Sequence, residues 1–361
     1  MNSRFDRRRL LGSLAAAGTL ALAPGLVRAQ QKKKVKAGWV YVGPIGDHGW
    51  TYRHDVGRRD VEKALGELVE TTYVEKVSEG PDAERVLRQM AATGHDIVFA
   101  TSFGFMNAVL RVAQQFPQVK FEHATGYRTA PNVAVYNARF YEGRAVIGTI
   151  AGHVSKSGIV GYVGSFPIPE VVRGINAFTL AMRKVRPDAQ IKVVWVDSWY
   201  DPAKEADAAK ALIDQGADVI TQHTDSAAPL QVAEERGVVG FGQASDMSKF
   251  APNAHLTAII DDWGPYYIQR VKAVLDGTWN SHSIWWGMKE GMIRIAPYNP
   301  RLPREVVEAA ERVRTGIIAG TLHPFAGPIY DQKGQLRVPE GRVLSDEDLL
   351  KMDWYVQGVQ A

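Results

Sequence analysis

Residues 35–43 read VKAGWVYVG, a short run of β-branched and aromatic residues that ends in glycine. The same ending, YVG, returns 121 positions later in residues 158–164, GIVGYVG. Short apolar runs bounded by glycine are typical of strands that are buried on both faces. Longer stretches with apolar residues three and four positions apart follow these runs. This alternation predicts strands joined by crossover helices in a parallel sheet.

The alternation continues through both halves of the chain. Predicted strands in the first half cover residues 35–42, 68–74, 96–101, 119–124 and 133–137, and residues 82–93 give the clearest helix. In the second half we predict strands at 158–164, 191–197, 218–221 and 238–241, and helices at 170–185, 203–215 and 226–235. The sequence therefore predicts an α/β protein with two doubly wound, Rossmann-like lobes.

Further matches at nearly the same spacing indicate that the halves are similar. PDA at 81–83 is echoed by PA at 202–203, and TGHDIV at 93–98 by QGADVI at 215–220. Each glycine in the second pair stands where a helix must end in a left-handed residue before the next strand.

The chain beyond residue 257 is too short for a third domain. We expect its pieces to complete both lobes, so that the chain crosses between them more than once through a hinge. The expected first lobe is 34–137 plus about 258–285, and the second is 138–257 plus about 286–361. Hinge strands are expected near 137, 255–257 and 285.

The net charge of +4 belongs to the N-terminus. Five of the 43 basic and one of the 39 acidic side chains lie in residues 1–29, which leaves 38 of each in the rest. A neutral remainder without a basic, aromatic stripe argues against nucleic-acid binding. The chain has no cysteine, which excludes disulfides, thiolate metal sites and a lipid-anchored lipobox cysteine.

Residues 1–29 are expected to be an export signal peptide. RRRLL at 7–11 precedes a short apolar run at 14–22 and the small-residue cleavage pattern VRA at 27–29. The consecutive arginines resemble the twin-arginine type of signal. The alternative is a disordered basic arm. Cleavage after Ala29 would leave a soluble, monomeric periplasmic protein that is not lipid-anchored.

Ligands of open α/β sheets bind beyond the carboxyl ends of the strands, so two such lobes form a cleft. Trp50 follows the glycine-rich turn at 43–49, and Trp199 follows the corresponding strand of the second half. An aromatic side chain from each lobe suits a flat ring held between two faces. The alternative is that both tryptophans only seal the packing of helices on strands. The loops expected at this cleft are 43–51, 102–107, 166–173, 197–201, 223–227, 244–247 and 261–263.

Two polar side chains in these loops can read the edge of a nitrogen heterocycle. Asp246 accepts hydrogen bonds, and the Asn107 amide both donates and accepts. Helix capping is the alternative role for each, as it is for Asp225 and Asp261. No nucleotide-binding glycine loop, hydrolase serine elbow or standard metal-ligand spacing occurs, so we expect neither a cofactor nor a metal.

Several segments, in order, resemble one family over most of residues 35–359. They are GDHGWT at 46–51, FGF at 103–105 with Asn107, YEG at 141–143, DPAK at 201–204 and QGADVI at 215–220. This combination is similar to the basic membrane protein family of substrate-binding proteins for ATP-binding-cassette (ABC) importers, in the PnrA-like group. The resemblance implies a type I periplasmic binding protein fold, a permease partner in the inner membrane and no enzymatic activity.

The resemblance also implies site residues. The family's two purine-stacking aromatics correspond to Trp50 and Trp199, and its cleft aspartate to Asp246. Its acidic residue after the Gly-Phe segment falls at Asn107, its loop asparagine at Thr51 and the lysine of nucleoside binders at Asp261. Losing that lysine and that asparagine weakens the case for a ribose. We therefore expect a purine nucleobase, adenine first, with a nucleoside as the alternative. The remaining expected contacts are Asp47, Gly49, Phe103 and Asp225.

Two other classes stay open. Acidic cleft residues such as Asp47, Asp225, Asp246 and Asp261 would also suit an exported nucleosidase or glycosidase-like hydrolase. A ligand-sensing partner of a membrane receptor would share the same fold and cleft.

Overall fold

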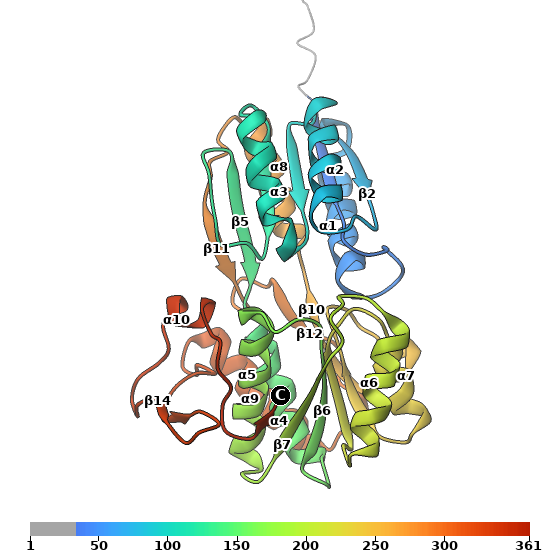
Figure 1. Ribbon diagram of the computed structural model, residues 1–361, viewed down its shortest axis with the longest axis vertical. Helices are drawn as coiled ribbons and strands as arrows, with labels where there is room; N and C mark the ends of the chain where they lie inside the picture. The colour runs from blue at the N-terminus through green and yellow to red at the C-terminus, as the bar shows by residue number, and fades with distance from the viewer. Residues whose placement is uncertain (1–33) are drawn as a thin grey trace, which may run out of the picture. The chain divides into compact units, whose positions relative to one another are not determined.

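Two sheets organise residues 34–361, the part of the chain that this computed structural model describes (Figure 1). The predicted signal peptide at 1–29 lies outside the described residues. The first sheet has the order β11-β5-β4-β3-β1-β2, and its strands pair in parallel. Its strands are β1 (Val35–Val40), β2 (Val69–Val74), β3 (Ile97–Ala100), β4 (Lys120–Ala124), β5 (Val133–Ala138) and β11 (Ser283–Trp286).

The second sheet repeats this arrangement with the order β12-β10-β9-β8-β6-β7-β15. Only β12, among its described strands, pairs antiparallel, with β10. The strands are β6 (Ile159–Gly164), β7 (Gln190–Trp195), β8 (Val219–His223), β9 (Val239–Gly242), β10 (His255–Asp261), β12 (Ile293–Ile295) and β15 (Val359–Gln360). A small hairpin of β13 (Ile329–Tyr330) and β14 (Leu336–Val338) stands apart from both sheets.

Helices cover both faces of each sheet, as buried parallel strands require. In the first lobe, α1 (Gly49–Leu65) packs with α8 (Gly264–Leu275), and α2 (Pro81–Ala92) packs with α3 (Met106–Gln115). In the second lobe, α4 (Phe140–Val154) packs with α5 (Pro169–Val185) and α9 (Arg304–Ala319), and α6 (Pro202–Asp214) packs with α7 (Ala228–Glu235). The short α10 (Asp346–Leu350) contacts α5. The predicted α/β class with two Rossmann-like lobes is confirmed.

The two lobes share an unusual backbone feature at the cleft edge. Within the described residues, the non-glycine residues with positive φ are Lys76 (58°) after β2, Asp197 (50°) after β7, Thr125 (59°) after β4 and Ala244 (59°) after β9. Positive φ is unfavourable for L residues. Its occurrence after equivalent strands shows that the chain leaves both sheets through the same kind of turn.

The chain passes between the sheets three times. It leaves the first sheet after Ala138, returns after Asp261 and crosses again after Trp286. Because all of β10 belongs to the second sheet, the return comes a few residues later than the predicted boundary near 258. At the first and third crossings, the Arg139 N–H donates to the Trp286 carbonyl at 2.8 Å, and the Trp285 indole donates to the Ala138 carbonyl at 2.9 Å. Two of the three crossing segments are therefore tied together.

None of the helices in residues 34–361 is both long enough and apolar enough to cross a membrane.

Candidate functional site

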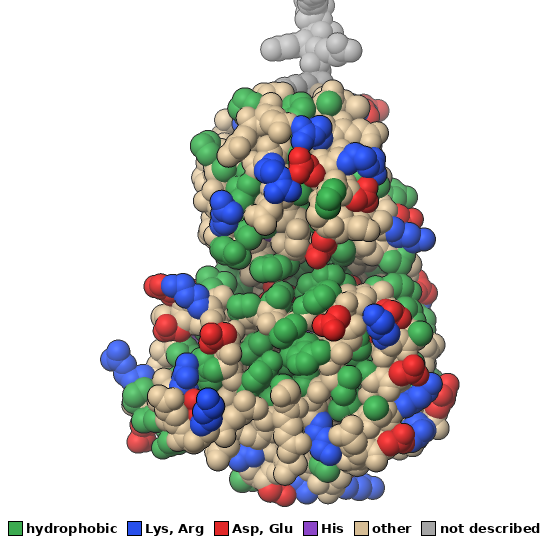
Figure 2. All heavy atoms as spheres, viewed as in Figure 1, with side chains coloured by type: hydrophobic (Ala, Val, Ile, Leu, Met, Phe, Trp, Pro, Cys, Tyr) green, Lys and Arg blue, Asp and Glu red, His purple; other side chains and the backbone are tan. Residues whose placement is uncertain are grey.

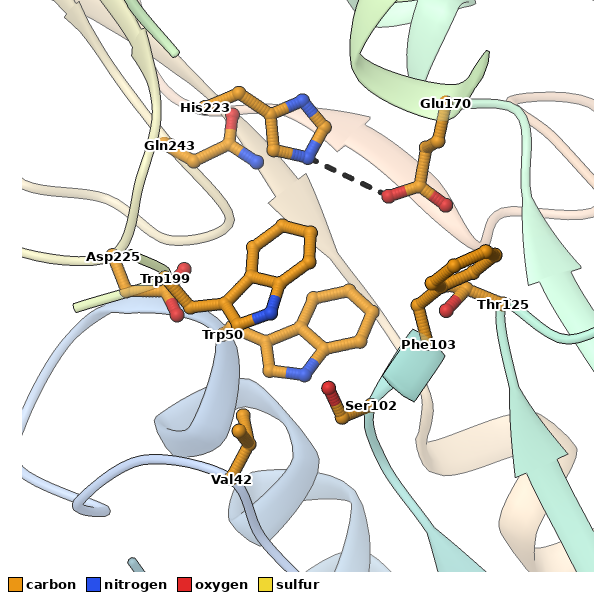
Figure 3. Close-up of a pocket in the computed structure, with 10 residues that line it drawn as sticks. All are labelled: Val42, Trp50, Ser102, Phe103, Thr125, Glu170, Trp199, His223, Asp225 and Gln243. Carbon is orange, nitrogen blue, oxygen red and sulfur yellow. Dashed lines mark ion pairs between the residues drawn. The ribbon is translucent and has the colours of Figure 1, made fainter. Parts of the chain in front are cut away.

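A cavity lies between the carboxyl ends of the two sheets (Figure 3), and the empty space among its lining side chains is about 380 Å³ including open solvent. Each lobe contributes five lining residues: Val42, Trp50, Ser102, Phe103 and Thr125 from the first, and Glu170, Trp199, His223, Asp225 and Gln243 from the second.

The first lobe gives the cavity an aromatic wall that is held firmly by the core. Trp50 is the second residue of α1, and its indole N–H donates to the Thr101 carbonyl at 2.7 Å. Its ring packs edge-on against Trp263 and His54, with centroids 5.3 and 4.3 Å apart. Trp50 therefore packs on the core and also lines the cavity, and its stacking on a ligand stays a prediction. Phe103 extends the apolar wall just after β3.

The second lobe gives the cavity a buried acid and imidazole. Glu170, in the first turn of α5, places Oε1 3.5 Å from Nε2 of His223 at the end of β8 (Figure 3). Their side chains are 10% and 8% exposed. Glu170 Oε2 and His223 Nδ1 are buried and have no hydrogen-bond partner. Burial lowers the pKa of His223, which favours the neutral imidazole at pH 7.

Gln243 is held with its amide nitrogen toward the cavity, as Figure 3 shows. Its Oε1 accepts a hydrogen bond from the fully buried Arg144 guanidinium, which also donates to the Gln222 carbonyl at 2.8 Å. Because the oxygen is occupied, Gln243 presents a hydrogen-bond donor to a ligand.

Asp225 links both tryptophans. Its backbone N–H donates to the Trp199 carbonyl at 3.0 Å, and the Trp50 backbone N–H donates to its carboxyl group. Burial first, and then the nearby carboxylates of Glu205 and Asp261, raise the pKa of Asp225 well above its usual range. Asp225 therefore connects the first-lobe wall to the second-lobe loop.

The lobes also touch beside the cavity. Glu79 of the first lobe accepts hydrogen bonds from Ser102 Oγ at 2.5 Å and from the indole of Trp199, in the second lobe, at 3.3 Å. The Gly49 N–H donates to Ser245 Oγ at 2.8 Å. A Cβ on Gly49, whose φ is +82°, would lie 2.5 Å from the Asp225 carbonyl oxygen. Only glycine allows α1 to approach the Asp225 backbone this closely. The two lobes are therefore in contact on the side of the cleft where Gly49 lies.

Four of the ten predicted site residues line the cavity, namely Trp50, Phe103, Trp199 and Asp225. Two more, Gly49 and Thr51, lie in the first turn of α1 beside the cavity. Thr51 Oγ1 accepts a hydrogen bond from the Gly43 N–H at 3.3 Å. Direct contact of these six residues with a ligand stays a prediction.

The other four lie away from the cavity lining. Asp47 is exposed and pairs with Lys249, and Asn107 is exposed on α3. Asp246 is exposed, and its Oδ1 accepts from the Ser248 N–H at 2.9 Å, a local turn contact. Asp261 is fully buried at the end of β10, with neither carboxyl oxygen hydrogen-bonded, and burial raises its pKa well above the usual range.

Sequence reasoning did not single out six of the lining residues: Val42, Ser102, Thr125, Glu170, His223 and Gln243. Ser102, Glu170 and His223 do fall within the loops expected at the cleft. Their position just beyond a strand was the available signal. In residues 34–361, no three histidine, aspartate or glutamate side chains converge as metal ligands.

The surface around the cleft is largely uncharged. On the face that Figure 2 shows, hydrophobic side chains surround the hollow between the lobes and extend over the second lobe. Lys, Arg, Asp and Glu side chains lie mostly toward the outer parts of this face. Such a rim attracts neither polyanions nor polycations strongly.

Two similar lobes around a cleft form an architecture that solute-binding proteins share with transcription regulators. A solved ABC transporter solute-binding protein from Aeropyrum pernix K1 superposes with a TM-score of 0.70 at 19% sequence identity, over 81% of this chain and 94% of that chain. The predicted type I periplasmic binding protein fold is thus confirmed.

The family follows from the sequence comparison. The model of the PnrA-like ABC transporter substrate-binding proteins matches residues 34–323, and the chain belongs to this family. A purine-binding protein from Brucella abortus (strain 2308) is 57% identical over 92% of this chain and 94% of its own length. A protein from Haloferax volcanii, named as a candidate ABC transporter glucose-binding protein, is 38% identical over 90% of this chain and 80% of its own length.

Proposed function

We propose that this substrate-binding protein captures a purine nucleobase, adenine first, for import by an ABC permease. The observation that carries the proposal is the pairing of aromatic walls with buried polar groups in one cavity. Trp50 and Trp199 offer ring faces from opposite lobes, while Glu170 and Gln243 offer an acceptor and a donor. The relative named as purine-binding supports this ligand class.

The relative named as a candidate glucose binder makes a sugar the natural competitor. A hexose presents hydroxyl groups around its whole edge and needs polar partners on several sides. Here the first-lobe wall is formed by Val42, Trp50 and Phe103 together with two hydroxyl side chains. That distribution favours a flat ring that stacks on aromatic faces and forms hydrogen bonds along one edge.

A nucleoside is the second candidate, since a larger hollow adjoins the cavity. It shares Phe103, Thr125 and Glu170 with the cavity and continues past Asn137 and Arg173, with an empty volume of about 1280 Å³ including open solvent. A sugar attached to the base would have space there.

On this proposal the protein binds its ligand and releases it chemically unchanged. A ligand binds in the open cleft, and the lobes close around it by bending at the three crossings, which makes the closed form available to the permease. We propose that the protein is exported by the signal at 1–29, which is of the twin-arginine type, and works as a soluble periplasmic monomer without a lipid anchor, cofactor or metal.

Isothermal titration of the purified protein with adenine, adenosine, guanine, uracil and glucose tests the ligand class. We expect one-to-one binding of adenine with the highest affinity and no measurable binding of glucose. Absence of binding to every purine, or preference for glucose, would contradict the proposal. Chromatography after prolonged incubation with adenosine tests the hydrolase alternative, because a binding protein returns the nucleoside unchanged.

A further inference from the structure

Glu170 differs from Asp225, the other acid that lines the cavity, because one of its oxygens is buried without a hydrogen-bond partner. We propose that Glu170 is the specificity-determining residue of the cavity, accepting a hydrogen bond from a ring N–H or an exocyclic amino group of the ligand. This inference rests on the proposed purine-binding function and deepens it. It assigns to Glu170 the ligand-reading role that family resemblance gave to Asp246.

Positively charged and dipolar groups surround Glu170. It lies in the first turn of α5, where backbone N–H groups favour negative charge. The buried guanidinium groups of Arg144 and Arg173 exert attractive electrostatic effects on it without hydrogen-bonding to it. Burial lowers the pKa of Arg173 only to about 10, so this group is positively charged at neutral pH. Oε2 has no hydrogen-bond donor among the described residues.

A buried acceptor that has no partner in the protein needs a donor from the ligand. Buried polar atoms are almost always hydrogen-bonded, and an unsatisfied one costs the protein the hydrogen bonds that it had with water. Oε2 is buried, and the side chain to which it belongs lines the cavity (Figure 3). A ligand N–H in the cavity would satisfy it.

The other acids of the cleft are occupied or out of reach. Asp246 is exposed and accepts the Ser248 N–H, and Asp225 accepts the Trp50 N–H. Asp261 has free oxygens, but it is fully buried and does not line the cavity. Among the described residues that line the cavity, Glu170 is therefore the carboxylate with a buried oxygen that lacks a hydrogen-bond partner.

A carboxylate acceptor predicts which purines are chosen. An amino group or a ring N–H donates to Oε2, whereas a carbonyl oxygen at the same place meets a negative charge. Sites built to hydrogen-bond one ligand group discriminate strongly against analogues that lack it. When the 6-amino group is the donor, we expect 6-aminopurines to be preferred to 6-oxopurines, whereas an N9–H donor, which both kinds carry, gives no such preference.

The test compares Glu170→Gln with Asp246→Asn, the same carboxylate-to-amide change at an exposed position. Each protein is titrated with adenine and hypoxanthine at pH 7.5. We expect E170Q to bind adenine ~10- to 100-fold more weakly, as befits loss of a hydrogen bond to a charged group. When the 6-amino group is the donor, the adenine-to-hypoxanthine affinity ratio should also fall, because the glutamine amide can donate to a carbonyl. D246N should stay within about twofold of the wild type, as expected for an exposed surface change.

Adenine binding by E170Q at wild-type strength, or the loss appearing in D246N instead, would overturn the inference while leaving the proposed function intact. If the wild type binds no purine, the proposed function fails and this inference fails with it.

A ligand series on the wild type covers the case in which E170Q does not fold, which thermal unfolding would reveal. N6,N6-dimethyladenine lacks the N–H donors of the amino group on the six-membered ring. 9-Methyladenine lacks the N9–H donor of the five-membered ring. Weaker binding of either analogue supports the inference and identifies the edge that is read. Binding of both analogues as tightly as adenine would overturn it.

Discussion

The two lobes share a backbone plan but supply the cleft with different chemistry. Ser102 of the first lobe lies just beyond β3, and His223 of the second lobe ends the equivalent strand, β8. Likewise Ala124 and Gln243 precede Thr125 and Ala244, the matching positive-φ residues. The first lobe therefore contributes apolar and hydroxyl groups where the second contributes imidazole and amide. The halves share one framework, and their side chains differ at the ends of the strands that face the cavity.

The largest expected effect separates the two tryptophans. Trp50→Ala should lower the free energy of unfolding by about 3 kcal/mol, since truncating a packed aromatic side chain removes burial and leaves a cavity. Trp50 packs on Trp263 and His54, whereas Trp199 is a partly exposed loop residue near Phe166. Chemical denaturation of both alanine variants measures this. A loss in W199A equal to that in W50A would contradict the contrast.

The next effect concerns the crossing between the lobes. Burial raises the pKa of Glu142, at the start of α4, from 4.5 to about 7, although its carboxylate accepts the Met288 N–H at 2.6 Å. A carboxyl group with a raised folded pKa costs stability as pH rises from its unfolded value through the folded one. Glu142→Gln does not titrate there and keeps an acceptor for Met288.

E142Q should therefore gain stability over the wild type as pH rises, with little difference at pH 4.5 and up to about 3 kcal/mol above pH 7. Thermal or denaturant unfolding across this pH range checks the trend. A stability difference that does not change with pH would contradict the assignment.

A change at Trp199 should weaken ligand binding while leaving the stability of the fold nearly unchanged. Trp199→Ala should weaken adenine binding by about 2 kcal/mol, or roughly 30-fold, through lost stacking and lost apolar contact. Because the side chain is partly exposed, unfolding should change little. Titration calorimetry of W199A beside the wild type measures the loss. Unchanged affinity would remove Trp199 from the site.

The smallest effect tests contact between the lobes outside the cavity. Ser245→Ala removes the acceptor of the Gly49 N–H, which should weaken adenine binding by about 1 kcal/mol, the usual net value of one hydrogen bond. Ser248→Ala, an exposed change close by in the same loop, serves as the control. Equal affinities for S245A and S248A would show that this contact does not support closure.

The sequence predicted the lobes because apolar runs in strands and glycines at the ends of helices and strands are local signals. It did not predict α4, which reads FYEGRAVIGTIAGHV and is buried on nearly all sides. A helix without a polar face has no amphipathic period to detect. Tertiary packing explains it: a Cβ on Gly148 would lie 2.4 Å from the Phe178 carbonyl oxygen of α5.

The site was predicted in part for a similar reason. Trp50 and Trp199 are conspicuous because large aromatics are uncommon in loops, and both line the cavity. Glu170 and His223 are separated by 53 positions and come together only in the folded protein, so no local sequence pattern predicts the pair. Asp246 illustrates the converse, because Asp-x-Ser at 246–248 is a local turn signature that competes with a role in ligand binding.

A crystal structure of the protein with adenine would show the binding mode itself. We expect the base in the cavity between Trp50 and Trp199, with a ligand nitrogen about 2.7–3.2 Å from a Glu170 carboxylate oxygen. The polar contacts to its edge should come mainly from the second lobe. Adenine bound outside this cavity, or held by Asp246 with Glu170 turned away, would contradict it.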